Sequence, residues 1–317
     1  MKFLVTGVLG QLGFDVMNEL AKRGYEAYGS DIAPEFRKQE GDYAINSMPY
    51  VQMDITDKDS VKRIINDIKP DHIIHCAAWT AVDAAEDEEN KPKVMAVNVN
   101  GCENIAKAAK DIDAVMTYIS TDYVFSGQGE KPWDPDCRDY APLNVYGESK
   151  YLGEKAVSEN TDKYFIVRIA WVFGLNGNNF IKTMVKVGKS HPEVRVVCDQ
   201  IGTPTYTFDL ARLLVDMNET NKYGYYHATN SEVEGDGEYT AEGCKTGFIS
   251  WYDFTKEIYR QAGMDTKVTP VTTEEYGLSK AARPRNSRLD KSKLTKAGFT
   301  PLPTWQDALR RYLEIMG

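Results

Sequence analysis

The feature that most constrains the fold of this chain is a repeated alternation, across its first half, of short β-branched runs with longer amphipathic stretches. Such alternation predicts a parallel sheet covered by helices on both faces, because each crossover between parallel strands carries a helix over one face. Strands are predicted at Lys2–Thr6, Glu26–Asp31, Val51–Asp54, Asp71–Ala77, Val115–Ser120 and Tyr164–Val172. Helices are predicted at Gln11–Arg23, Asp57–Ile68, Lys93–Lys110 and Val145–Glu159.

A glycine-rich turn joins the first predicted strand to the first predicted helix. Gly7, Gly10 and Gly13 allow a tight turn, and Gln11 and Leu12 open the helix whose free N–H groups can hold a pyrophosphate. Three glycines alone are weak support, but a strand before them and a helix after them is the context that a dinucleotide site requires. The sequence therefore predicts an α/β fold of the Rossmann type, with a doubly wound parallel sheet.

Further cofactor contacts are expected where the next strands end. Asp31 lies 18 residues after Gly13 and can accept hydrogen bonds from the hydroxyls of an adenosine ribose, although such a residue can also cap a turn. Ligands of open α/β sheets bind at the carboxyl ends of the strands, and small residues there let a cofactor lie against the backbone. The third and fourth strands end in Asp54, Ile55, Ala77, Ala78 and Trp79.

A Tyr-x-x-x-Lys pattern supplies candidates for proton transfer to a ketone, because a nearby cation lowers the pKa of a tyrosine. The pattern occurs at Tyr146/Lys150, Tyr151/Lys155, Tyr252/Lys256 and Tyr276/Lys280. The first two follow the fifth strand, which leads into Thr121 and Asp122, whereas the last two lie outside the sheet-forming half. Thr121 could donate a hydrogen bond to a substrate oxygen, although strand packing also explains it.

The chain is predicted to divide into two unequal domains. Residues 1–172 with 203–230 are assigned to a dinucleotide-binding domain, and residues 173–202 with 231–317 to a smaller C-terminal substrate-binding domain. Ser231–Gly247 is rich in Gly and Glu without an apolar period and is predicted to be a long loop. Ser250–Gln261 and Thr304–Ile315 are predicted to be surface helices.

Composition excludes several classes of function. A net charge of −9 over 317 residues argues against a partner that is a nucleic acid. No run of eighteen apolar residues is present, so no association with a membrane is expected. Five scattered cysteines without a CxxC pair indicate reduced thiols and a cytoplasmic protein. The four histidines follow no zinc-ligand spacing, and no metal site is predicted.

Seven collinear segments spread over nearly the whole chain form a more specific pattern. They are Gly7–Gly13, Ala77–Asp83, Ser120–Phe125, Tyr146–Glu154, Arg168–Gly174, Asp199–Thr205 and Arg283–Ser287. In this order they resemble the dTDP-4-dehydrorhamnose reductases, which are members of the extended short-chain dehydrogenase/reductase superfamily. The resemblance implies reduction by NADH or NADPH of the 4-keto group of dTDP-4-dehydro-β-L-rhamnose to dTDP-L-rhamnose.

The resemblance also implies roles for individual residues. Tyr146 would be the proton donor, Lys150 its activating partner, and Thr121 the residue that tunes the proton transfer. Thr121, Asp122 and Trp171 would contact the sugar. Gly10, Gln11, Leu12, Asp31, Asp54, Ile55, Ala77, Ala78 and Trp79 would line the cofactor, and Trp79 departs from the Tyr or His that is usual in the family.

Two alternatives stay open at the level of sequence. One is an epimerase, or a reductase for another nucleotide-linked keto sugar, which would share the fold and the Tyr–Lys pair. The other is a non-catalytic regulatory relative, against which the intact Thr121, Tyr146 and Lys150 argue. The expected partner is a small-molecule nucleotide sugar, and the chain is expected to be a monomer or a homodimer.

Overall fold

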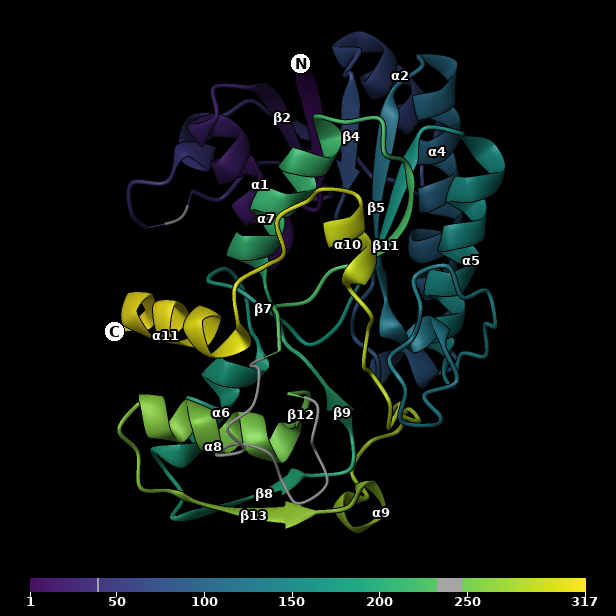
Figure 1. The fold of residues 1–317 in the computed structure, drawn as a ribbon. Helices are drawn as coiled ribbons and strands as arrows, with labels where there is room; N and C mark the ends of the chain where they lie inside the picture. The colour runs from purple at the N-terminus through teal and green to yellow at the C-terminus, as the bar shows by residue number, and fades with distance from the viewer. Residues whose placement is uncertain (39, 233–246) are drawn as a thin grey trace.

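The computed structural model describes residues 1–38, 40–232 and 247–317 and has a seven-stranded sheet at its centre (Figure 1). Its strand order is β11-β6-β5-β4-β1-β2-β3, and every neighbouring pair is parallel. The strands are β1 (Lys2–Thr6), β2 (Glu26–Asp31), β3 (Tyr50–Gln52), β4 (His72–His75), β5 (Val115–Thr121), β6 (Tyr164–Ile169) and β11 (Gly224–His227).

Helices cover both faces of this sheet, as a doubly wound fold requires (Figure 1). One face carries α1 (Gln11–Lys22) and α7 (Thr207–Asn218), and the other carries α2 (Lys58–Ile68), α4 (Cys102–Asp111) and α5 (Val145–Asn160). Strand side chains alternate between the two cores: Phe3 and Val5 pack on the α1 side, and Leu4 packs on the α2 side. The predicted α/β fold of the Rossmann type is therefore confirmed.

Two predicted elements differ from those in the structure. The predicted helix Lys93–Lys110 is divided into α3 (Lys91–Met95), a π-helical turn η3 (Ala96–Gly101) and α4. The predicted strand Tyr164–Val172 ends three residues early, because Trp171 has a left-handed backbone with φ of 51°. The chain resumes as β7 (Val172–Phe173), which pairs with β10 (Thr205–Tyr206).

A second group of elements packs beyond the carboxyl ends of the strands. It has its own core, to which Phe254, Trp305 and Tyr312 contribute buried rings. The predicted surface helices thus each bury one face there. The elements of this group are α6 (Phe180–Gly188), β8 (Glu193–Val197), β9 (Ile201–Gly202), β12 (Ile249–Ser250), α8 (Trp251–Gln261), β13 (Lys267–Val271), α9 (Thr273–Tyr276) and α11 (Trp305–Met316).

The segment between α9 and α11 returns to the large sheet. It contains α10 (Ser292–Lys296), and its Leu294 and Phe299 join the same core as Phe3. The predicted division into domains stays a proposal. The predicted loop Ser231–Gly247 falls almost entirely on residues 233–246, which lie outside the described residues. Within the described ranges, every helix is too short or too polar to cross a lipid bilayer.

Candidate active site

Two adjoining cavities lie at the carboxyl edge of the large sheet, with volumes of about 240 Å³ and about 520 Å³. Both are lined by Gly7, Gly10 and Ala78, so they form one continuous depression. The smaller cavity is also lined by the predicted cofactor residues Asp31, Asp54, Ile55 and Ala77. The larger one is also lined by the predicted residues Gln11, Leu12, Gly13, Thr121, Asp122, Tyr146, Lys150 and Trp171.

The glycine turn has the close backbone packing that a pyrophosphate site needs. Gly7 has φ of 71°, and a Cβ added there would lie 2.6 Å from the backbone nitrogen of Ala77. A side chain at Gly13 would collide with the carbonyl of Gly7. Gly10, which has no side chain, is the N-cap of α1, so the N–H groups of the first turn face the cavity without a capping side chain. These residues fit the phosphates of a dinucleotide.

Two carboxylates face the smaller cavity, where an adenosine would lie. Asp31 Oδ2 accepts a hydrogen bond from the N–H of Leu9 (3.0 Å), and its Oδ1 accepts one from the N–H of Ile32 (2.8 Å). A carboxylate can accept about four hydrogen bonds, so Asp31 retains capacity for ribose hydroxyls. Asp54 Oδ1 accepts bonds from the backbone N–H (2.9 Å) and the hydroxyl (2.7 Å) of Thr56, which fixes the turn after β3.

Helix α5 brings Tyr146 and Lys150 to the larger cavity. Asn144 caps the helix by accepting a hydrogen bond from the N–H of Gly147 (2.7 Å), which places Tyr146 in the first turn. Burial raises the pKa of Tyr146 well above its usual range, and the hydroxyl of Thr121 opposes that rise. Burial also lowers the pKa of Lys150 to about 8. The Lys150 ammonium lies 4.1 Å from the centre of the Tyr118 ring.

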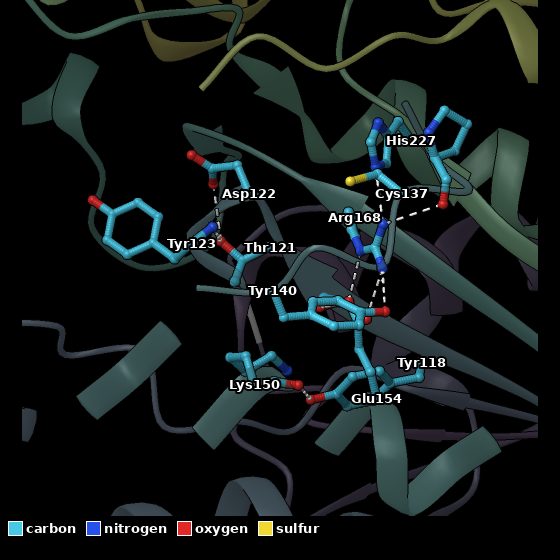
Figure 2. Close-up of polar contacts among 12 residues, drawn as sticks. Tyr118, Thr121, Asp122, Tyr123, Cys137, Tyr140, Lys150, Glu154, Arg168 and His227 are labelled. Atoms are coloured by element: carbon cyan, nitrogen blue, oxygen red, sulfur yellow. Dashed lines mark hydrogen bonds and ion pairs between the residues drawn. The ribbon is translucent and has the colours of Figure 1, made fainter. Parts of the chain in front are cut away.

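The end of β5 faces this pair of residues from the sheet. Thr121 Oγ1 donates a hydrogen bond to Asp122 Oδ1 (2.9 Å) and accepts one from the N–H of Tyr123 (3.2 Å), as Figure 2 shows. Burial raises the pKa of Asp122 to about 6. The rings of Tyr123 and Tyr146 meet edge to face, with centroids 5.6 Å apart. A tyrosine hydroxyl and polar side chains that could bond a carbonyl oxygen thus line one cavity.

Two tryptophans line part of the larger cavity, which the glycine turn also lines. Trp171 stacks on Trp251, the first residue of α8, with ring centroids 3.9 Å apart and an interplanar angle of 19°. Trp251 also packs on Phe180, and both tryptophans line the cavity. The left-handed backbone of Trp171 is strained for a residue with a large side chain, a feature common at functional sites. Sequence reasoning missed Trp251, because nothing local distinguishes it from any aromatic residue that opens a helix.

Asn98 is a second residue that the sequence did not reveal. It lies in η3, and π-helical turns occur frequently at functional sites. Its side chain accepts a hydrogen bond from the N–H of Trp79 (2.8 Å) and donates to the carbonyl of Trp79 (3.1 Å) and to Ser149 Oγ (2.9 Å). Of the predicted site residues, all of which are described, Trp79 alone lies outside both cavity linings.

A third cavity, of about 920 Å³, lies away from these two, between α6, α8 and α11. The residues that line it include none of the predicted site residues, and several of its charged side chains pair with one another: Arg310, for instance, bonds both Asp307 and Glu314. We therefore place the candidate active site at the sheet edge, where the predicted site residues lie, although this cavity has the greater volume.

Among the described residues, His, Cys, Asp and Glu side chains form no group of three that could hold a metal ion.

Comparisons with known proteins agree with this geometry. The model of the family named RmlD substrate binding domain matches residues 1–317. The spore coat polysaccharide biosynthesis protein SpsK of Bacillus subtilis is 36% identical over 313 residues, which are 99% of this chain and 97% of that protein. A dTDP-4-dehydrorhamnose reductase structure from Clostridium acetobutylicum is 37% identical with a TM-score of 0.85, over 100% of this chain and 99% of that one. A reductase of the same name from Bacillus anthracis, solved with NADP, is 38% identical with a TM-score of 0.83, over 99% of each chain.

Proposed function

The chain belongs to the RmlD substrate binding domain family, and on that premise we propose that it reduces dTDP-4-dehydro-β-L-rhamnose to dTDP-L-rhamnose with NADH or NADPH. The observation that carries the proposal is the single depression in which the glycine turn, Thr121, Tyr146 and Lys150 meet. A nucleotide sugar that enters beside the two tryptophans would present its keto group to these side chains. The chain would accordingly act as an NAD(P)-dependent oxidoreductase in dTDP-rhamnose biosynthesis.

The reaction needs a hydride and a proton. The nicotinamide, when bound, supplies the hydride to the keto carbon. Tyr146 donates its hydroxyl proton to the carbonyl oxygen, because the raised pKa of Tyr146 keeps this group protonated at neutral pH. The Lys150 ammonium then stabilises the phenolate that forms, and the hydroxyl of Thr121 stabilises it further. Water subsequently reprotonates Tyr146.

The pKa of Lys150 gives this scheme a pH dependence. A lysine with a pKa of about 8 is mostly an ammonium at pH 7 and mostly neutral above pH 9. Activity is therefore expected to fall on the alkaline side as the cation disappears.

The same cavity would also suit another nucleotide-linked keto sugar or an epimerisation, since both use the same proton donor. A cytoplasmic location and a monomeric or homodimeric state, both expected from the sequence, stay proposals.

Steady-state oxidation of NADH and NADPH with a panel of keto sugars tests the proposal. dTDP-4-dehydro-β-L-rhamnose is expected to give the highest kcat/KM, ahead of other dTDP-linked and CDP-linked keto sugars. A higher kcat/KM for one of those sugars would assign the chain to a different substrate. Cofactor binding with no turnover of any keto sugar would indicate a non-catalytic relative.

A further inference from the structure

Behind the proposed catalytic residues lies an ion pair that the reaction scheme does not use. Arg168, on β6, and Glu154, on α5, have side chains that are 0% and 1% exposed. Arg168 donates from Nε to Glu154 Oε1 and from Nη2 to Oε2, both at 2.8 Å (Figure 2). Two parallel bonds of this kind fix the direction of both side chains as well as their separation.

Every N–H of the Arg168 guanidinium has an acceptor. Beyond the two bonds to Glu154, Nη2 donates to the hydroxyl of Tyr140 (2.8 Å), and Nη1 donates to the carbonyl of Pro135 (3.2 Å) and to His227 Nε2 (3.3 Å). Since arginine only donates, His227 Nε2 is the acceptor in its contact. Burial and the Arg168 charge hold the pKa of His227 well below its usual range, which keeps that imidazole neutral. The guanidinium thus has one available orientation.

The ion pair reaches the end of β5 through a third side chain. Ser120 Oγ donates a hydrogen bond to Glu154 Oε1 (2.6 Å). Ser120 immediately precedes Thr121 in the chain, so Glu154 bonds both the residue before Thr121 and the neighbouring strand β6. Three elements, α5, β5 and β6, are therefore joined at one buried carboxylate.

Glu154 also lies one helical turn after Lys150, at i+4, so their side chains leave the same face of α5. The hydroxyl of Tyr118, on β5, donates to the carbonyl of Lys150 (3.3 Å), which holds this turn of the helix against the sheet. A buried ion pair is a poor means of stabilising a fold, because its desolvation cost offsets much of its attraction. Its bond to Ser120, which precedes Thr121, and its place one turn after Lys150 on α5 connect it to the site.

We propose that the Glu154–Arg168 ion pair is a positioning device that holds α5 against β5 and β6, so that Tyr146 and Lys150 face Thr121. Neither residue lines the cavity, so both act through others. The proposal rests on the proposed function only in assigning Tyr146 and Lys150 to proton transfer.

Of the side chains that raise the pKa of Lys150, which are Cys102, Glu154 and Cys76, Glu154 is the anion. Burial lowers the pKa of His75, at the end of β4, to about 3, and raises those of Cys76 and of Cys102, on α4, to about 12. Both tyrosines that approach Lys150, Tyr118 and Tyr146, have pKa values raised by burial. All five groups are neutral at pH 7. The Glu154 charge raises the pKa of Lys150 against the lowering effect of burial.

Glu154→Gln tests the proposal, because glutamine keeps the shape of the side chain and removes its charge. The pKa of Lys150 should then fall, so the alkaline decline of kcat should move to lower pH by about one unit. At the wild-type optimum kcat should drop roughly tenfold or more, with the KM for the nucleotide sugar little changed. The pH dependence of NADPH affinity, followed by fluorescence without any sugar, should move in the same direction.

Two further variants keep the test decisive. Glu257→Gln is the matched control, because Glu257 is also 1% exposed and paired with an arginine, but lies on α8, in the group of elements beyond the carboxyl ends of the strands. It should lower the melting temperature without moving the pH profile. Ser120→Ala removes the bond to Glu154 and leaves both charges, so kcat should fall roughly fivefold with no pH shift. Because Ser120 also lines the cavity, an unchanged KM for the nucleotide sugar is needed to assign that fall to positioning.

The outcomes separate this proposal from the proposed function. A wild-type protein that reduces no keto sugar overturns the function, and the NADPH titrations still test the effect of Glu154 on Lys150. A folded Glu154→Gln variant with wild-type kcat and an unmoved pH profile overturns the positioning role, as does an equal shift in Glu257→Gln. If Glu154→Gln does not fold, wild-type kcat in Ser120→Ala overturns it.

Discussion

Replacing either of two nearby tyrosines by phenylalanine should have opposite consequences for turnover. Tyr146 lines the cavity, whereas the ring of Tyr151 packs on Tyr140 with centroids 4.4 Å apart, behind α5. A helix turns about 100° per residue, so five residues rotate a side chain about 140° from its starting direction. Tyr146→Phe should therefore remove most activity, and Tyr151→Phe should retain it, although each tyrosine begins a Tyr-x-x-x-Lys pattern.

The size of the expected loss follows from the role of the hydroxyl. A positioned general acid contributes roughly 10²–10⁴ in rate, which is about 3–5 kcal/mol of activation free energy. Phenylalanine keeps the edge-to-face contact of Tyr146 with Tyr123, so the free energy of unfolding should change by less than about 1 kcal/mol. Tyr151→Phe keeps its packing on Tyr140, and its rate should stay within about threefold of wild type.

The assay is NADPH oxidation with dTDP-4-dehydro-β-L-rhamnose, after fluorescence titration has shown that both variants still bind NADPH. Wild-type melting temperatures in both would exclude misfolding as the cause of any loss. An inactive Tyr151→Phe, or a Tyr146→Phe that retains about a third of the wild-type rate, would refute the assignment of Tyr146 as the acid.

Three other changes probe the substrate wall, the cofactor pocket and a buried carboxylate. Trp171→Ala should raise the KM for the nucleotide sugar roughly tenfold or more. It should lower the melting temperature less than Trp305→Ala does, because Trp305 is fully buried away from both cavities. Equal loss of stability in both variants would make Trp171 a packing residue. NADH should serve at least as well as NADPH, because the Asp31 carboxylate repels the 2′-phosphate of NADPH. Asp31→Asn should therefore raise the kcat/KM of NADPH relative to that of NADH. An unchanged ratio of the two kcat/KM values would contradict this. Burial raises the pKa of Asp15 to about 7, so its contribution to stability is full below about pH 4 and is lost as pH rises through 7. In chemical denaturation, Asp15→Asn should remove up to about 4 kcal/mol of that pH dependence. Parallel curves of unfolding free energy against pH for the wild type and the variant would disprove this.

The large sheet could be predicted because its strands and turns carry local signals. Strands β1 and β4 are buried on both faces and therefore have nearly continuous apolar runs, such as Phe3–Val5 and Ile73–Ile74. The glycine turn is recognisable because a close backbone approach tolerates only glycine at Gly7 and Gly13. Position after the fifth strand reduced the four Tyr-x-x-x-Lys matches to Tyr146/Lys150 and Tyr151/Lys155, and the family resemblance then implied the first.

Other parts of the structure depend on contacts between distant residues. The edge strand β11 is only four residues long, and α7 is buried over most of its surface, so neither has a clear period. The π-helical turn around Asn98 is stabilised by bonds to Trp79 and Ser149, which lie 19 and 51 residues away in the chain. The pairing of Glu154 with Arg168 is likewise a property of the assembled sheet.

Transfer of deuterium from 4-deuterated NADPH to the sugar tests the proposed reaction most directly. When the deuterium replaces the C4 hydrogen of NADPH that is transferred (pro-R or pro-S), NMR and mass spectrometry should show one deuterium at C4 of dTDP-L-rhamnose. That result requires hydride transfer from the cofactor to the 4-keto carbon, on the face that gives the configuration of rhamnose. A product without deuterium at C4 from either labelled form of NADPH, or a C4 configuration other than that of rhamnose, would contradict the proposed reaction.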